Sequence, residues 1–104
     1  MDIKKEIKDA IELWDDPEWA TMPPARRIQV AAMEIAQAGA TVLTALGSSE
    51  HLAELTTACE ELFDEYVGPI DLAHVGPVAE RFLKRFIRGQ IGPLLKAYVV
   101  FVGE

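Results

Sequence analysis

Four basic residues in the last third of the chain are spaced so that they share one face of a helix. Arg81, Lys84, Arg85 and Arg88 stand at i, i+3, i+4 and i+7, and residues three and four apart are neighbours on a helix surface. Like charges placed this way repel each other, so the spacing predicts an anionic group close by. A basic amphipathic helix of this kind suits an acidic protein, a membrane surface or RNA.

The other half of the same segment is apolar and favours a plainer interpretation. Its residues are Val78, Ala79, Phe82, Leu83, Phe86 and Ile87. They would belong to the core, while the basic half is solvated or pairs with acidic residues of an earlier helix. The formal net charge is −7, and the acidic residues are concentrated in the first two-thirds of the chain. Broad nucleic-acid binding is disfavoured, because phosphates would repel most of such a surface.

Five carboxylates follow one side of the segment 49–67, and helical bundles build some metal sites from carboxylates. They are Glu50, Glu54, Glu61, Asp64 and Glu65. The Glu-x-x-His pattern of such sites is absent, because His51 precedes Glu54. The other helices offer only Glu34 as an inward acid. We therefore expect a solvated acidic face, with no metal ion and no other cofactor.

The single cysteine, Cys59, lies on the apolar stripe of the segment 49–67, which favours a buried, inert thiol. A nucleophilic thiol needs a nearby base, and the only histidines are His51 and His74. His51 is two helical turns away, and nothing in the sequence brings His74 close. We expect no catalytic residues. One cysteine and a charged first ten residues, without a signal peptide, indicate a cytoplasmic chain.

Two further cations, Arg26 and Arg27, occupy an unusual position after a pair of prolines. Cations in the first turn of a helix oppose the helix dipole. Pairing with Glu18, Asp15 or Asp16 is the simplest explanation. The alternative is that this corner binds an anion or a partner.

The elements that position these residues are all predicted to be helical. Apolar periodicity predicts three main helices, over 2–14, 24–46 and 49–67. A short helical turn follows Asp16, and Gly47 ends the second main helix. That helix has a flat face of small residues, so we expect another helix to approach closely at Gly39. No apolar run approaches the roughly 20 residues of a membrane-spanning helix.

Three tripeptides of the form β-branched–Gly–Pro divide the last third of the chain. They begin at Val67, Val75 and Ile91. Glycine ends a helix by adopting a positive φ at low cost, and proline suits the first turn of the next helix. The tripeptides therefore predict short helices over 70–74, 77–88 and 93–102.

The terminal segment is more apolar than a single helix face requires. Its stripe consists of Ile91, Leu94, Leu95, Tyr98, Phe101 and Val102, and Val99 and Val100 lie outside it. This excess favours packing against a second copy of the chain. Because 98–102 is rich in strand formers, a terminal strand is the alternative.

Together these patterns predict an all-α fold, a small bundle of three main helices closed by short Gly-Pro-punctuated C-terminal helices. We expect one helical domain, residues 1–104. Its expected function is a non-enzymatic interaction module that self-associates or docks a protein partner. The expected contact residues are Arg81, Lys84, Arg85, Arg88, Tyr98 and Phe101.

Two other functions remain open at this point. One is a small-molecule or lipid-binding bundle, with or without catalysis, whose cavity would be lined by the flat Ala/Gly face, the paired phenylalanines, Trp14, Trp19, Met22 and Met33. The other is a binder of anionic surfaces, a membrane or RNA, through the four basic residues of 77–88.

Overall fold

The computed structural model describes residues 2–11, 16–47, 49–72 and 75–102, with side chains except those of 49 and 100–102. Within these ranges the chain forms helices and no strand. The elements are α1 (Ile3–Ala10), α2 (Pro17–Thr21), α3 (Pro24–Leu46), the 3-10 turn η2 (Ser49–His51), α4 (Leu52–Val67), α5 (Pro77–Arg88) and α6 (Ile91–Val102). The predicted all-α bundle is confirmed.

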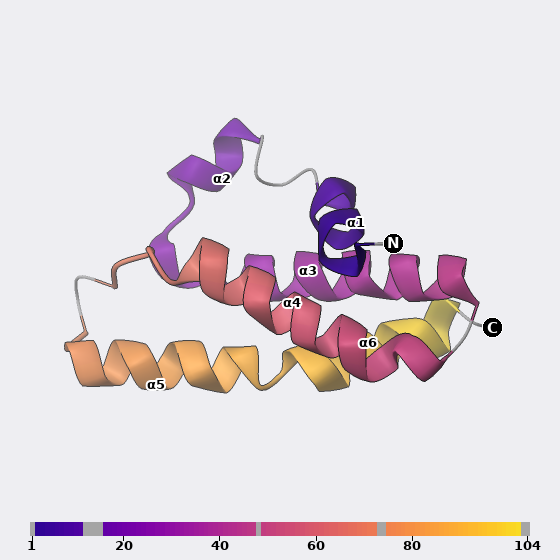
Figure 1. The fold of residues 1–104 in the computed structure, drawn as a ribbon. Coiled ribbons are helices and arrows are strands. Elements are labelled where there is room, and N and C mark those ends of the chain that lie inside the picture. Colours follow the sequence, from indigo (N-terminus) through magenta and orange to yellow (C-terminus); the bar gives the residue numbers. More distant parts are fainter. Residues whose placement is uncertain (1, 12–15, 48, 73–74, 103–104) are drawn as a thin grey trace.

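The long helix α3 is the centre of the bundle, and α1, α4, α5 and α6 all contact it. Figure 1 shows α1 lying across α3 and α4, with α5 running alongside the C-terminal half of α4 and leading into α6. α6 and α4 make the most extensive contacts with α3. The short helix α2 has no fully buried residue and contacts the core through the partly buried Trp19.

The flat face of α3 allows the close approach that the sequence predicts at Gly39. A Cβ atom at this position would lie 2.7 Å from Cys59 Sγ of α4 and 3.1 Å from Leu95 Cδ1 of α6. Neighbouring alanines of α3, including Ala32, Ala36 and Ala40, are also buried. The lack of a side chain at one position therefore lets three helices meet.

By length and composition α3 could also cross a membrane, although the sequence predicts no such run. It has 23 residues, and an 18-residue window in it has a mean hydropathy of 1.2. Within the bundle 56% of that window is buried by the rest of the chain. A mostly buried core helix of a helical bundle can have the same length and hydropathy as a membrane-spanning helix.

The first helix is shorter than predicted. Asp2 caps α1 by accepting a hydrogen bond from the Lys5 backbone N–H at 3.2 Å. The helix ends at Ala10, because Ile11 turns to an extended conformation and places its side chain in the core. The rest of the predicted range, 12–14, lies outside the described residues. Asp16 caps α2 as predicted, accepting from the Glu18 N–H at 2.9 Å.

The glycines of the three tripeptides do not act as predicted. Gly68 is right-handed with φ −49°, Gly76 is the N-cap of α5 with φ −65°, and Gly92 lies inside α6. Among the described residues only Gly47 has a positive φ, of 69°. Two of the three prolines act as predicted, because Pro77 and Pro93 occupy first turns. Pro69 lies in a turn and starts no helix.

Two predictions for the last third are therefore wrong. Ile70 to Leu72 is not helical, because the side chains of Ile70 and Leu72 are buried and α5 binds this backbone through Lys84 and Glu80. Residues 73–74 of that predicted helix lie outside the described residues. The alternative of a terminal strand is also wrong, because α6 starts at Ile91, two residues early, and continues to Val102.

The contact at Gly39 makes a testable prediction about stability. Gly39→Ala should favour the helix by about 1 kcal/mol through propensity, but overpacking of a core costs about 1–3 kcal/mol. We expect a net loss of free energy of unfolding of about 1 kcal/mol, measured by urea denaturation.

The double variant Gly39→Ala/Cys59→Ala distinguishes this clash from a general effect at Gly39. Removing the sulfur leaves space for the new methyl group, so the two substitutions together should cost less than the sum of their separate effects. Strict additivity would contradict the contact.

Candidate functional site

Most of the apolar half of α5 faces solvent, so the prediction that it belongs to the core is wrong except for Ile87. Val78, Phe82 and Phe86, one per helical turn, are 66%, 68% and 67% exposed. Leu83 beside them is 36% exposed, and in α5 only Ile87 is buried. Below, Val78, Phe82, Leu83 and Phe86 are called the α5 outer face.

Part of the basic half of α5 is turned towards the chain itself. Arg88 donates from Nε to both carboxylate oxygens of Asp64 at 3.1 Å, and its Nη1 lies 3.3 Å from Glu60. Both acids belong to α4. The alternative that the basic half of this helix pairs with an acidic helix therefore holds for Arg88.

Lys84 fixes the segment that leads from α4 to α5. Its ammonium donates to the carbonyl oxygens of Gly68 at 3.0 Å and Ile70 at 2.6 Å, and it pairs with Glu80 at 3.0 Å. Glu80 in turn accepts from the Leu72 N–H at 3.2 Å. These hydrogen bonds lower the pKa of Glu80, the Lys84 contact having the largest effect. The network holds α5 with its apolar half outwards.

The other two basic residues of α5 remain available. Arg81 and Arg85 are exposed, and neither has an ion pair or side-chain hydrogen bond within the described part of the chain. Together with Val78 and Phe82 they line a shallow groove on α5. The groove thus has an apolar side and a cationic side, and aromatic residues and arginine are both enriched at protein interfaces.

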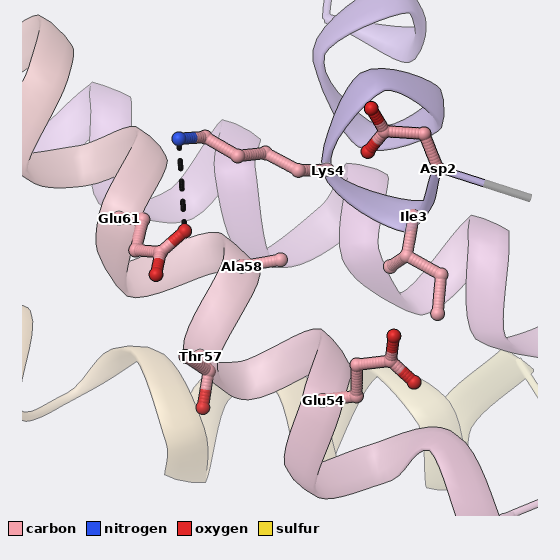
Figure 2. Close-up of a pocket in the computed structure, with 7 residues that line it drawn as sticks. All are labelled: Asp2, Ile3, Lys4, Glu54, Thr57, Ala58 and Glu61. Carbon is pink, nitrogen blue, oxygen red and sulfur yellow. Dashed lines mark ion pairs between the residues drawn. The ribbon is translucent and has the colours of Figure 1, made fainter.

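The acidic face of α4 is largely occupied by cations of the same chain. Lys4 of α1 lies 3.6 Å from Glu61 and 2.5 Å from Glu65, and these carboxylates raise the pKa of Lys4. Figure 2 shows the depression between α1 and α4 in which Lys4 extends over Glu61. His51 Nδ1 lies 3.6 Å from Glu54. Within the described ranges, no three His, Cys, Asp or Glu residues are placed to share a metal ion.

Cys59 is buried, as predicted. Its Sγ lies 3.7 Å from the carbonyl oxygen of Ile35, and burial, with a smaller effect from Glu60, raises its pKa to about 12. The thiol is therefore protonated at neutral pH and is a poor nucleophile. His51 pairs with Glu54 instead, and His74 lies outside the described residues.

The remaining predicted site residues lie apart from the α5 outer face or outside the described part. Tyr98 is half-buried against the core, and the side chain of Phe101 is not described. Arg26 and Arg27 make no ion pair with Glu18 or Asp16, and the Arg27 Nε is buried without a hydrogen-bond partner. Asp15, the third predicted partner of these arginines, is not described.

The residues proposed for an internal cavity do not converge. Met33 is 47% exposed on α3, whereas Trp19 of α2 packs against the core. Met22 is half-exposed between α2 and α3, and Trp14 lies outside the described ranges. The sequence could identify α5 as amphipathic but carried no signal that its apolar half would face outwards.

Comparisons with protein-family models, with curated proteins and with solved structures gave no match to this chain.

The Glu80 network predicts a specific pH dependence of stability. A carboxyl whose pKa is lower in the folded chain than its ordinary 4.5 stabilises the fold above that value and loses this effect as the pH falls through the lowered pKa. The difference in free energy of unfolding between the wild type and Glu80→Gln should be positive at neutral pH and should shrink towards zero in acid. Urea denaturation across this range measures it, and a difference independent of pH would contradict the role of the charged carboxylate.

Burial of Cys59 predicts that its thiol is protected in the folded chain. A disulfide reagent in mildly alkaline buffer should modify the denatured chain at the rate of a free thiol and the native chain only at the rate of unfolding. Equal rates in the two states would show that the thiol is accessible. Cys59→Ala is the blank for this measurement.

Proposed function

We propose that this chain is a non-enzymatic interaction module that binds an acidic surface of another protein through the α5 outer face. The observation that carries the proposal is the exposure of Val78, Phe82 and Phe86, about two-thirds each, along one side of a helix. Contiguous apolar surface framed by polar residues is typical of protein–protein contacts. Arg81 and Arg85 supply the polar frame on one edge.

The energy available at this surface supports binding. Full burial of a valine or phenylalanine side chain contributes about 1.5–3 kcal/mol. Val78, Phe82 and Phe86 are each about two-thirds exposed, so most of this free energy would be gained only when a partner covers them. The exposed ion pair between Arg88 and Asp64, which helps to hold α5 in place, contributes about 0–1 kcal/mol. Covering the α5 outer face would therefore release more free energy than this pair contributes.

A second copy of the chain is a less suitable partner than an acidic one. Arg81 and Arg85 border the apolar stripe, and neither has an anion in the described part of its own chain. A second α5 would bring two more arginines and no free carboxylate, since Glu80 is engaged by Lys84 and Leu72. An acidic partner covers the stripe and also neutralises the arginines.

A chain of this kind suits the cytoplasm, and we propose that location. Cys59 is a free thiol, and unpaired cysteines are ordinary in a reducing compartment. Its burial keeps it from cross-linking to a partner.

The test is the double variant Phe82→Ser/Phe86→Ser, with Met33→Ser as the matched control. Both variants replace exposed apolar side chains, but Met33 lies on α3, outside the α5 outer face. Proteins retained from an extract of the source cells by the wild type, and not by the double variant, would be purified. We expect calorimetry to show one-to-one binding that the double variant weakens about a hundredfold.

We also expect Met33→Ser to bind as tightly as the wild type. The circular dichroism melting curve of Phe82→Ser/Phe86→Ser should match that of the wild type, which shows that the loss of binding is not due to unfolding. Two outcomes would overturn the proposal. One is a retained protein that binds the wild type and the double variant equally. The other is a wild-type dimer in sedimentation equilibrium that Phe82→Ser/Phe86→Ser converts to a monomer, which would make the second copy the partner.

A further inference from the structure

The positive charge on α5 lies along only one edge of the α5 outer face. Successive residues of a helix are rotated by about 100°. Relative to Phe82, Arg85 and Arg81 therefore lie about 60° and 100° to one side. Leu83 lies about 100° to the other side, followed by the buried Ile87. The surface thus has a cationic edge and an apolar edge.

This asymmetry restricts how any helix can lie against α5. In an antiparallel pair of two α5 helices, a twofold axis keeps the same edges together, so Arg81 and Arg85 of both copies would line one side. In a parallel pair each cationic edge would face Leu83 of the other copy, which has no charge. In both arrangements the other α5 offers these arginines no free carboxylate, since Glu80 is engaged, and the first arrangement adds repulsion.

An extended anionic surface fits the α5 outer face less well than a narrow one. Asp64 and Glu60 of α4 lie on the cationic side, where they hold Arg88. A membrane or a nucleic acid that reached past α5 would meet these carboxylates, in a chain whose net charge is −7. A single helix lying along α5 would meet Arg81 and Arg85 before it met the carboxylates of α4.

We propose that the ligand of α5 is an acidic amphipathic helix, an inference that rests on the proposed function and names the chemistry of its partner. One apolar side chain per turn of that helix would enter the spaces between Val78, Phe82 and Phe86. Asp or Glu residues along one of its edges would pair with Arg81 and Arg85. Since α5 has 12 residues, three to four turns of partner helix would cover it, a length of about 18 Å.

The experiment uses the full chain and two designed helical peptides that share one apolar face. The first carries glutamates along the edge next to that face, and the second carries glutamines at the same positions. Fluorescence anisotropy measures their affinities for the wild type. At low salt we expect the glutamate peptide to bind about tenfold more tightly, because two exposed ion pairs are worth about that factor.

Charge reversal gives the sharper test. With Arg81→Glu/Arg85→Glu the glutamate peptide should lose its advantage, and a third peptide with lysines at the same edge should become the tightest ligand. Phe82→Ser/Phe86→Ser should remove binding of all three peptides. Lysine-peptide binding that is equally strong with the wild type and with Phe82→Ser/Phe86→Ser reports only the overall negative charge of the chain. This background is subtracted from the binding measured with Arg81→Glu/Arg85→Glu.

The possible failures separate the inference from the proposed function. Equal affinity of the glutamate and glutamine peptides, both lost in Phe82→Ser/Phe86→Ser, would overturn the acidic helix and leave protein docking through α5 in place. No binding of any peptide would also overturn the acidic helix, while the protein purified from the cell extract tests docking separately. Binding of phosphatidylserine vesicles or RNA that Arg81→Glu/Arg85→Glu abolishes, without peptide binding, would overturn both.

Discussion

The close packing of three helices at Gly39 is the constraint on which the rest of the structure depends. Because Gly39 has no side chain, Cys59 of α4 and Leu95 of α6 reach the backbone of α3. α4 and α6 therefore occupy much of the surface of the central helix, and α1 covers a further part. α5 joins these two helices in sequence but finds little of α3 left to cover, so it buries Ile87 and leaves its phenylalanines outside.

The polar contacts of α5 follow from this lack of space. A half-turn of α5 would direct Phe82 and Phe86 inwards, but it would also move Lys84 away from the carbonyl groups of Gly68 and Ile70. Those carbonyl oxygens belong to the non-helical connection between α4 and α5, so within the described residues they accept no hydrogen bond from a helical backbone N–H. Backbone oxygens that lose a partner near the core are costly, so the connection and the orientation of α5 stabilise each other.

The sequence predicted the helices far better than it predicted what they bury. Periodicity located α3 within its exact bounds and α4 to within a few residues, and the close contact at Gly39 followed from a glycine inside a run of small residues. The tripeptides placed α5 correctly through Pro77, although Gly68 and Gly76 turned out not to be left-handed. An amphipathic pattern predicts that a helix has an apolar and a polar face. Which of these faces packs against the core depends on the space that the other helices leave. That space is a property of the whole bundle, and for this reason the exposure of Phe82 and Phe86 could not be predicted.

The same logic explains why one helix concentrates the groups that remain free to act. Several other charged or reactive groups are neutralised inside the chain, since Cys59 is buried and protonated, Lys4 covers Glu61 and Glu65, and Arg88 holds Asp64. On α5, the side chains left without a partner within the described chain are both cationic and apolar, Arg81 and Arg85 beside Phe82 and Phe86. Neither component alone specifies a ligand: the apolar stripe would accept many surfaces, and two exposed arginines would bind any anion weakly. Their fixed placement on a helix anchored by Glu80 and Lys84 combines them into one surface, whose apolar stripe supplies affinity and whose cationic edge selects the partner.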